Sequence, residues 1–248
     1  MLRGAGTVLN MATVLGGAGL GVLLGGRLPE RTRTTVTDAL GLVTLVIGAL
    51  NVASLADPAF RGAVGDSGTL LVVLGALVLG GITGSLLRLE DRLEQSGAWL
   101  QRRLSRGDAT EGRARFVEGY VSASLVFVVG PLAVLGSLSD GLGRGIDQLA
   151  LKSTLDGFAS LAFAATLGWG VAAAAVSVGV VQGLLTLLGF ALGAFLPAAS
   201  IAAVTATGGV LLLGVGLRLL HLKPVAVGDL LPALLVAPAL TALVQALR

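Results

Sequence analysis

The sequence predicts an all-α integral membrane protein with about eight transmembrane helices. Hydrophobic residues make up 54% of its 248 residues and charged residues only 12%, which is about half the charged share of a soluble domain. The mean hydropathy is +0.92, and the apolar residues form blocks of about 20, the length at which a helix spans a bilayer. This composition excludes a soluble enzyme, a disordered chain and a nucleic-acid-binding protein, so the lipid bilayer is the expected partner.

The apolar blocks define the expected elements in chain order. We expect spans at 7–26, 37–55, 69–87, 116–138, 149–168, 171–196, 201–220 and 226–247. The fourth span contains Glu118 and Pro131, and the fifth contains Lys152 and Asp156. The runs do not alternate polar and apolar residues, so they do not fit a membrane β-barrel. One transmembrane domain over 1–248 is therefore expected.

The longest polar stretch, 88–115, sets the expected orientation. It carries seven arginines, and its first residues have helical apolar spacing, which fits an amphipathic surface helix or a solvated linker. Twelve basic residues follow the odd-numbered spans, and five lie on the other side with both termini. Because basic residues stay cytoplasmic, we expect 88–115 in the cytoplasm and both termini outside.

An internal repeat relates the two ends of the chain. Residues 21–29 and 189–197 share a Gly-x3-Gly-x2-Leu-Pro pattern at an offset of 168 residues, and further glycines stay in register. Spans 1–3 then correspond to spans 6–8. Because span 1 is related to span 6, the two copies run in opposite directions, which is typical of transporters.

The centre of the chain repeats as well. Glu118 and Asp156 each begin an acid-glycine-aromatic motif that leads into Ala-Ser-Leu-x-Phe. Gly130-Pro131 interrupts the first of these spans, and proline breaks or kinks a helix. The sequence therefore predicts two inverted-topology repeats, about 1–138 and 149–248, with broken or kinked helices near the centre.

Acidic residues within the spans are the first candidates for a binding site, because a charge at a helix centre costs about 2.5–3.5 kcal/mol in lipid. Asp156 shares a helix face with Ser153 and Ser160, and Glu118 shares one with Ser122. Such oxygen-lined faces suit H⁺, Na⁺ or a hard divalent cation.

Each of these acids also has a structural interpretation. Asp156 can pair with Lys152 one turn earlier, and Glu118 can offset a helix dipole near the membrane interface. Asp140, in a Ser-Asp-Gly turn, and Asn10, an amide in span 1, are further candidate ligands. Asp140 can instead cap a helix, and Asn10 can bond between helices.

The cysteine and histidine contents limit the kinds of metal site and catalytic site that the chain can form. The chain has no cysteine and one histidine, which excludes thiolate sites and multi-histidine metal sites. Nucleotide and protease motifs are missing, so we expect no enzyme activity and no cofactor, and the identity of any bound metal is open. Glycines at every fourth position, as in 17–25, allow close helix packing within the chain or in a homo-oligomer.

Several motifs resemble a known family. They include Gly-Thr-Val-Leu-Asn at 6–10, Gly-Pro-Leu-Ala-Val-Leu-Gly-Ser at 130–137 and Lys-Ser-x-x-Asp-Gly-Phe-Ala-Ser at 152–160. The chain is similar to the YdfK/YqgA-like family of bacterial multi-pass membrane proteins over nearly its whole length. This resemblance implies a bacterial inner-membrane location. It also implies that span 1 is a membrane helix and not a signal peptide that is removed. It implies no substrate. A shorter similarity links residues 156–160 to small bacterial metal-cation exporters.

From these features we expect a small transporter or channel for a small ion or solute, with its site between spans 4 and 5. The acids favour a cation or a proton. A non-transporting scaffold, sensor or partner subunit is the alternative.

Overall fold

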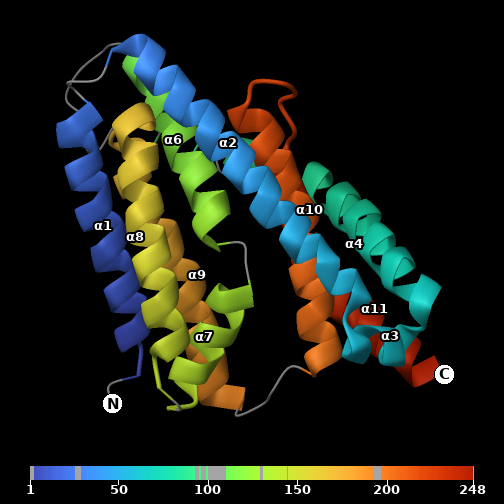
Figure 1. Ribbon diagram of the computed structural model, residues 1–248. Helices are drawn as coiled ribbons and strands as arrows, with labels where there is room; N and C mark the ends of the chain where they lie inside the picture. The colour runs from blue at the N-terminus through green and yellow to red at the C-terminus, as the bar shows by residue number, and fades with distance from the viewer. Residues whose placement is uncertain are drawn as a thin grey trace. The chain divides into compact units, whose positions relative to one another are not determined.

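The computed structural model describes residues 3–25, 29–92, 95, 99, 110–128, 131–143, 145–192 and 197–247, and the elements within them are all helices (Figure 1). Five helices are long and apolar enough to cross a membrane, or up to seven if each of two bent pairs is one span. The all-α membrane class is thus confirmed, whereas a count of eight spans remains a prediction.

The described residues form helices along the whole chain. In chain order they are α1 (Ala5–Gly25), α2 (Glu30–Val52), η1 (Ala53–Ala56), α3 (Pro58–Val64), α4 (Asp66–Leu86), α6 (Thr110–Val128), α7 (Pro131–Gly141), α8 (Asp147–Leu167), α9 (Gly170–Leu192), α10 (Ala198–Leu219), η2 (Val227–Leu230) and α11 (Ala233–Leu247). Residues 89–92 are also helical. The predicted amphipathic continuation at 93–94, 96–98 and 100–109 lies outside the described residues.

Two bends differ in how well the sequence predicted them. The expected break in span 4 is present, because α6 and α7 meet at 76° and α7 begins at Pro131. The bend of 52° between α2 and α3 was not predicted. The Asp57 carboxylate causes a new helix to begin there, since it accepts the amides of Ala59 at 2.8 Å and Phe60 at 3.2 Å, and Pro58 suits the first helical turn.

The fifth predicted span, α8, is long enough to cross a membrane at 21 residues, but it is not among the candidate spans. Its composition is too polar, because Lys152, Asp156 and several hydroxyl residues interrupt the apolar run. Helix α2 also differs from the prediction, since it begins at Glu30 instead of residue 37.

The chain divides into two compact units, and each of them contains helices from both predicted repeat halves. The first contains Met1–Leu40, Leu93–Val128 and Leu132–Phe195, and the second contains Gly41–Arg92, Val129–Pro131 and Leu196–Arg248. Each unit combines helices from both ends of the sequence. The physical reason is that helices of one half pack on helices of the other, as the glycine contacts below show.

Glycines determine the packing of the first unit. A Cβ on Gly17, Gly21 or Gly25 of α1 would overlap the carbonyl oxygens of Gly157, Leu161 and Ala165 of α8. The partner numbers rise together in steps of four, so α1 and α8 are parallel and their backbones touch over two turns. Figure 1 shows the two helices side by side. The predicted role of the Gly-x3-Gly-x3-Gly face in close packing is confirmed, and this contact lies within one chain.

In the second unit, α4 packs against η2 and α11, and α2 packs against α10. A Cβ on Gly84 would overlap the Asp229 carbonyl, and one on Gly80 would overlap the Ala233 backbone. The numbers run in opposite senses, so these segments are antiparallel. Around Phe60, which is fully buried, small and branched side chains of α3, α4, α10 and α11 form the apolar core.

A charged cluster holds the residues after α4 in this unit. The Glu90 carboxylate forms an ion pair with Arg218 of α10 and accepts the Gly228 amide at 2.6 Å. The Asp229 carboxylate accepts the Glu90 amide at 2.9 Å. The Glu90 and Arg218 side chains are both largely buried, so their mutual pairing is needed to offset the cost of removing the two charges from water.

Candidate functional site

The main polar cluster of the first unit surrounds Asp156 in the middle of α8. The Asp156 carboxylate forms an ion pair with Lys152, one helical turn earlier. It also accepts a hydrogen bond from Asn10 Nδ2 of α1 at 2.9 Å. Asp156 is 7% exposed, Lys152 6% and Asn10 0%, so the carboxylate, ammonium and amide form one buried unit.

The local sequence and the helix packing both contribute to this arrangement. Lys152 and Asp156 are four residues apart, which places them on one helix face. Asn10 approaches because small residues of α1 let this helix pack closely on α8. A Cβ on Gly17 would overlap the Gly157 carbonyl oxygen, and a Cβ on Gly6 would overlap the Leu149 side chain. Chemically, the positive and negative charges cancel, and the cluster presents one carboxylate that already has a cationic partner.

The two α8 hydroxyls predicted beside Asp156 are present on the buried side of the helix. However, Ser153 Oγ donates to the Leu149 carbonyl at 2.6 Å and Ser160 Oγ donates to the Gly157 carbonyl at 2.9 Å. Their hydrogens are therefore used within their own helix. Their oxygens can still accept a hydrogen bond from a ligand.

Asp140 has a different role from the one expected of a ligand. Its carboxylate, at the end of α7, accepts the amides of Gly4 at 3.1 Å and Gly6 at 3.0 Å, at the start of α1. It thus caps a helix that begins 134 residues or more away along the chain. The first N–H groups of a helix need such an acceptor, so the structure favours the capping interpretation.

Glu118 and Ser122 lie on α6, and no described hydrogen bond or ion pair joins them to Asp156. Glu118 is half-buried, and Ser122 is fully buried with no hydrogen-bond partner for its hydroxyl among the described residues. The described partners of Asp156 thus lie on α1 and α8, and a site between the fourth and fifth predicted spans remains a prediction.

Two further polar residues of the first unit, Gln182 and Ser137, are fully buried. Gln182 of α9 has no hydrogen-bond partner among the described residues for either amide atom, and neither has the Ser137 hydroxyl of α7 or Asn10 Oδ1. In the sequence, Gln182 is an amide within the apolar run 171–196, and no pattern of residues distinguishes Ser137. An unpaired buried polar group costs about 1–3 kcal/mol, so these atoms favour a polar ligand.

No group of three or more His, Cys, Asp or Glu side chains among the described residues is placed to hold a metal ion. A hard divalent cation normally takes six or more oxygen ligands, several of them carboxylates. The described residues therefore do not build a divalent metal site of that kind.

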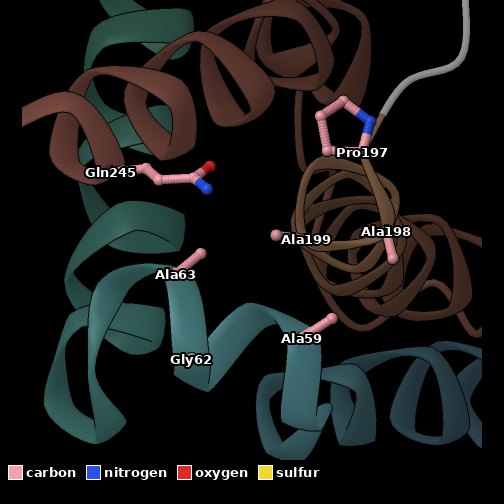
Figure 2. Close-up of a pocket in the computed structure, with 7 residues that line it drawn as sticks. All are labelled: Ala59, Gly62, Ala63, Pro197, Ala198, Ala199 and Gln245. Carbon is pink, nitrogen blue, oxygen red and sulfur yellow. The ribbon is translucent and has the colours of Figure 1, made fainter.

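A pocket of about 560 Å³ lies in the second unit, and no charged side chain is among the residues that line it. Figure 2 shows Gln245 as the one polar side chain that lines it, with small residues of α3 and the start of α10 forming the rest. The lining residues are Ala59, Gly62, Ala63, Pro197, Ala198, Ala199 and Gln245. This lining supplies no acid, base or ion pair, so the Asp156 cluster is the stronger candidate.

Comparison with known proteins identifies the family. A family model described as "Protein of unknown function (DUF554)" matches residues 5–242. The chain belongs to the DUF554 family. Its relatives include the uncharacterized protein YqgA of Escherichia coli strain K12, at 32% identity over 96% of both chains. They also include the uncharacterized membrane protein YdfK of Bacillus subtilis strain 168, at 27% identity over 97% of both chains.

These relatives confirm the resemblance seen in the sequence. The name of YdfK and the apolar helices together support a membrane location for this DUF554 protein. No solved structure matches the chain significantly.

Proposed function

We propose that this DUF554 protein is a small membrane transporter or channel for a small ion, with a cation or proton as the favoured species. The observation that carries the proposal is the Asp156 carboxylate, which is buried among apolar helices and held by Lys152 and Asn10. Ionisable groups inside membrane segments are costly and commonly mark ion pathways.

The charges suggest how such a site can work. Because Lys152 already neutralises Asp156, an incoming cation or proton has to compete with the ammonium group for the carboxylate. Binding then separates Lys152 from Asp156. A change in an internal ion pair can be coupled to a change in helix packing, and such coupling is what a transport cycle requires.

The inverted repeat gives a second line of support. An offset of 168 residues relates Gly41 to Gly209 and Gly48 to Gly216, and it relates the start of α2 to the start of α10. A Cβ on Gly48 would meet the Gly209 carbonyl oxygen at 2.9 Å, and a Cβ on Gly216 would meet the Gly41 carbonyl oxygen at 3.1 Å. Such exchanged contacts are what a two-fold axis between equivalent helices produces.

A similar relation holds in the first unit. The same offset makes Met11 of α1 equivalent to Gly179 of α9, and these two residues are in contact. Equivalent helices thus cross antiparallel to one another, which favours inverted repeats of the kind found around transporter sites. For the cellular arrangement we propose an inner-membrane protein with both termini outside the cytoplasm.

A non-transporting scaffold or partner subunit is the second candidate function. It is favoured by the completeness of the Lys152–Asp156 pair, which needs no external ion. The exposed apolar helix faces could then serve contacts with lipid or with other copies of the chain.

Ion flux into proteoliposomes distinguishes the two functions. We expect purified protein to carry a cation or protons, and Asp156→Asn to abolish this flux while the protein stays folded. Asp147→Asn is the matched control, because Asp147 is an exposed acid on the same helix. Normal flux through a folded Asp156→Asn variant would exclude this site, and a complete lack of flux in wild type would favour the scaffold.

A further inference from the structure

Unpaired polar atoms of the first unit form a feature that the Lys152–Asp156 ion pair does not explain. Asn10 Oδ1, Ser137 Oγ, Gln182 Oε1 and Gln182 Nε2 are buried without a hydrogen-bond partner among the described residues. All three residues are 0% exposed. Leaving one such group unpaired is costly, and these four, with Ser122 Oγ as a fifth in the same unit, require an explanation.

The packing contacts place Asn10 and Gln182 in the same stretch of the α1–α9 interface. Thr7 Oγ1 and Thr186 Oγ1 are 3.4 Å apart, and a Cβ on Gly179 would lie 2.6 Å from the Met11 sulfur. Asn10 lies between Thr7 and Met11 in α1, and Gln182 lies between Gly179 and Thr186 in α9. The two amides are therefore on facing helices within the same helical turn.

Ser137 approaches the same region from α7. Its neighbours on that helix contact the three other helices: Gly136 lies against Leu149 of α8, Asp140 binds the start of α1, and Gly141 lies against the Thr186 carbonyl of α9. Ser137 is enclosed between these contacts. The unpaired atoms thus collect where α1, α7, α8 and α9 meet.

The hydrogen-bond donors and acceptors among these unpaired atoms indicate which ligand fits them. Asn10 Oδ1 and Gln182 Oε1 accept hydrogen bonds, Gln182 Nε2 donates them, and Ser137 Oγ does both. A metal ion would satisfy the oxygens but not the donor Nε2. Water satisfies all of them, because it donates two hydrogen bonds and accepts two, and a buried water typically has two to four polar partners.

We propose that Asn10, Ser137 and Gln182 form an internal water-binding site that connects to Asp156, and that the transported ion is therefore a proton. Asn10 provides the link, since its Nδ2 donates to Asp156 and its Oδ1 is available to the water. The inference rests on the proposed transport function for its choice of ion, whereas the water site itself does not.

The proposed step is the transfer of one proton to the Asp156 carboxylate. A hydronium ion that moves from the water site to the Asp156 carboxylate transfers its proton to a carboxylate oxygen, which leaves a carboxylic acid and a water molecule. Asn10 orients the water and the carboxylate but does not itself carry the proton. The neutral acid no longer holds the Lys152 ammonium by charge, so the ion pair opens. Loss of the proton to the opposite side restores the carboxylate and the pair.

Proton flux and infrared spectra test the two parts separately. In proteoliposomes that contain a trapped pH-sensitive dye, with K⁺ and valinomycin to balance charge, Gln182→Leu should lower proton flux about tenfold, the effect of one lost hydrogen bond. Gln245→Leu, the same change at an exposed position, should leave the flux unchanged. Infrared difference spectra between neutral and acidic pH should show a bound-water band that shifts in H₂¹⁸O and is lost in Gln182→Leu.

The flux and infrared results test the proton assignment, the proposed function and the water site separately. Wild-type flux of Na⁺, K⁺ or Mg²⁺ without proton movement would overturn the proton assignment and leave the proposed transport function intact. Wild-type proton flux in a folded Asp156→Asn variant would exclude Asp156 as the transport site, and a complete lack of flux in the wild-type protein would overturn the proposed function. A wild-type spectrum without the water band, or a band that persists in Gln182→Leu, would overturn the water site whatever the flux.

Discussion

The Lys152–Asp156 pair allows a quantitative test of how charge is held inside this protein. In Lys152→Met the Asp156 carboxylate stays buried with Asn10 as its remaining partner. Removing one member of a buried ion pair typically lowers the free energy of unfolding by about 3–5 kcal/mol. For a chain of 248 residues, where 1 kcal/mol shifts Tm by about 2–4 °C, the expected fall in Tm is roughly 6–20 °C.

The double variant Lys152→Met with Asp156→Leu should be more stable than either single variant. It removes both charges and replaces them with apolar side chains of similar size, which is often neutral or stabilising. One cost remains, because Asn10 Nδ2 loses its acceptor, and an unpaired buried donor costs about 1–3 kcal/mol. The two substitutions are therefore expected to be strongly non-additive.

Thermal unfolding in detergent measures this cycle, with tryptophan fluorescence as the signal. Trp169, at the turn between α8 and α9, is 58% exposed and should report on changes at the end of α8. All variants need the same scan rate, because unfolding of such proteins is commonly irreversible. If the double variant loses as much Tm as the two single variants together, the charges act independently and the paired-charge argument is wrong.

Three other predictions follow from the packing and the termini. Gly21→Ala should lower Tm, because its Cβ would overlap the Leu161 carbonyl. Gly19→Ala, the control with open space around it, should be neutral or stabilising by up to about 1 kcal/mol. Equal effects of the two substitutions would contradict the α1–α8 contact. Asp140→Asn should weaken the cap on α1 and cost about 1–2 kcal/mol, seen as faster amide exchange over the first turn of α1; unchanged exchange would exclude the capping role. Arg92→Cys, which gives this cysteine-free chain a single cysteine, should react with an impermeant maleimide only from the cytoplasmic side. A C-terminal tag should be accessible from outside. A cytoplasmic tag would reject the eight-span topology.

Much of the fold could be predicted from local sequence features. The membrane class follows from composition, since apolar residues in blocks of helix-spanning length have one stable environment. The break between α6 and α7 follows from Gly130-Pro131, although residues 129–130 lie outside the described residues. The bend before α3 was missed, because the capping of Ala59 and Phe60 by Asp57 is a short polar signal within an otherwise apolar region.

The candidate site could be predicted only in part. Asp156 and its partner Lys152 were visible because a four-residue spacing brings them together on any helix. Glu118 was paired with Asp156 on the basis of a shared motif, yet no described hydrogen bond or ion pair connects them. A repeated motif shows that two helices are similar, but it does not show that they pack against each other at those residues.

The sequence by itself determined that this protein is helical, lies in a membrane, has glycine faces for close packing and carries an acid beside a lysine in one helix. These properties depend on composition and on spacing within one helix. Only the tertiary structure decided that Asn10 binds Asp156, 146 residues away, that Asp140 caps α1, and that Gln182 and Ser137 belong to the same region. These contacts depend on which helix faces meet, and in an apolar chain many pairings of faces bury similar area. The glycine contacts of α1 with α8 bring the backbones close enough for one arrangement of polar side chains to form.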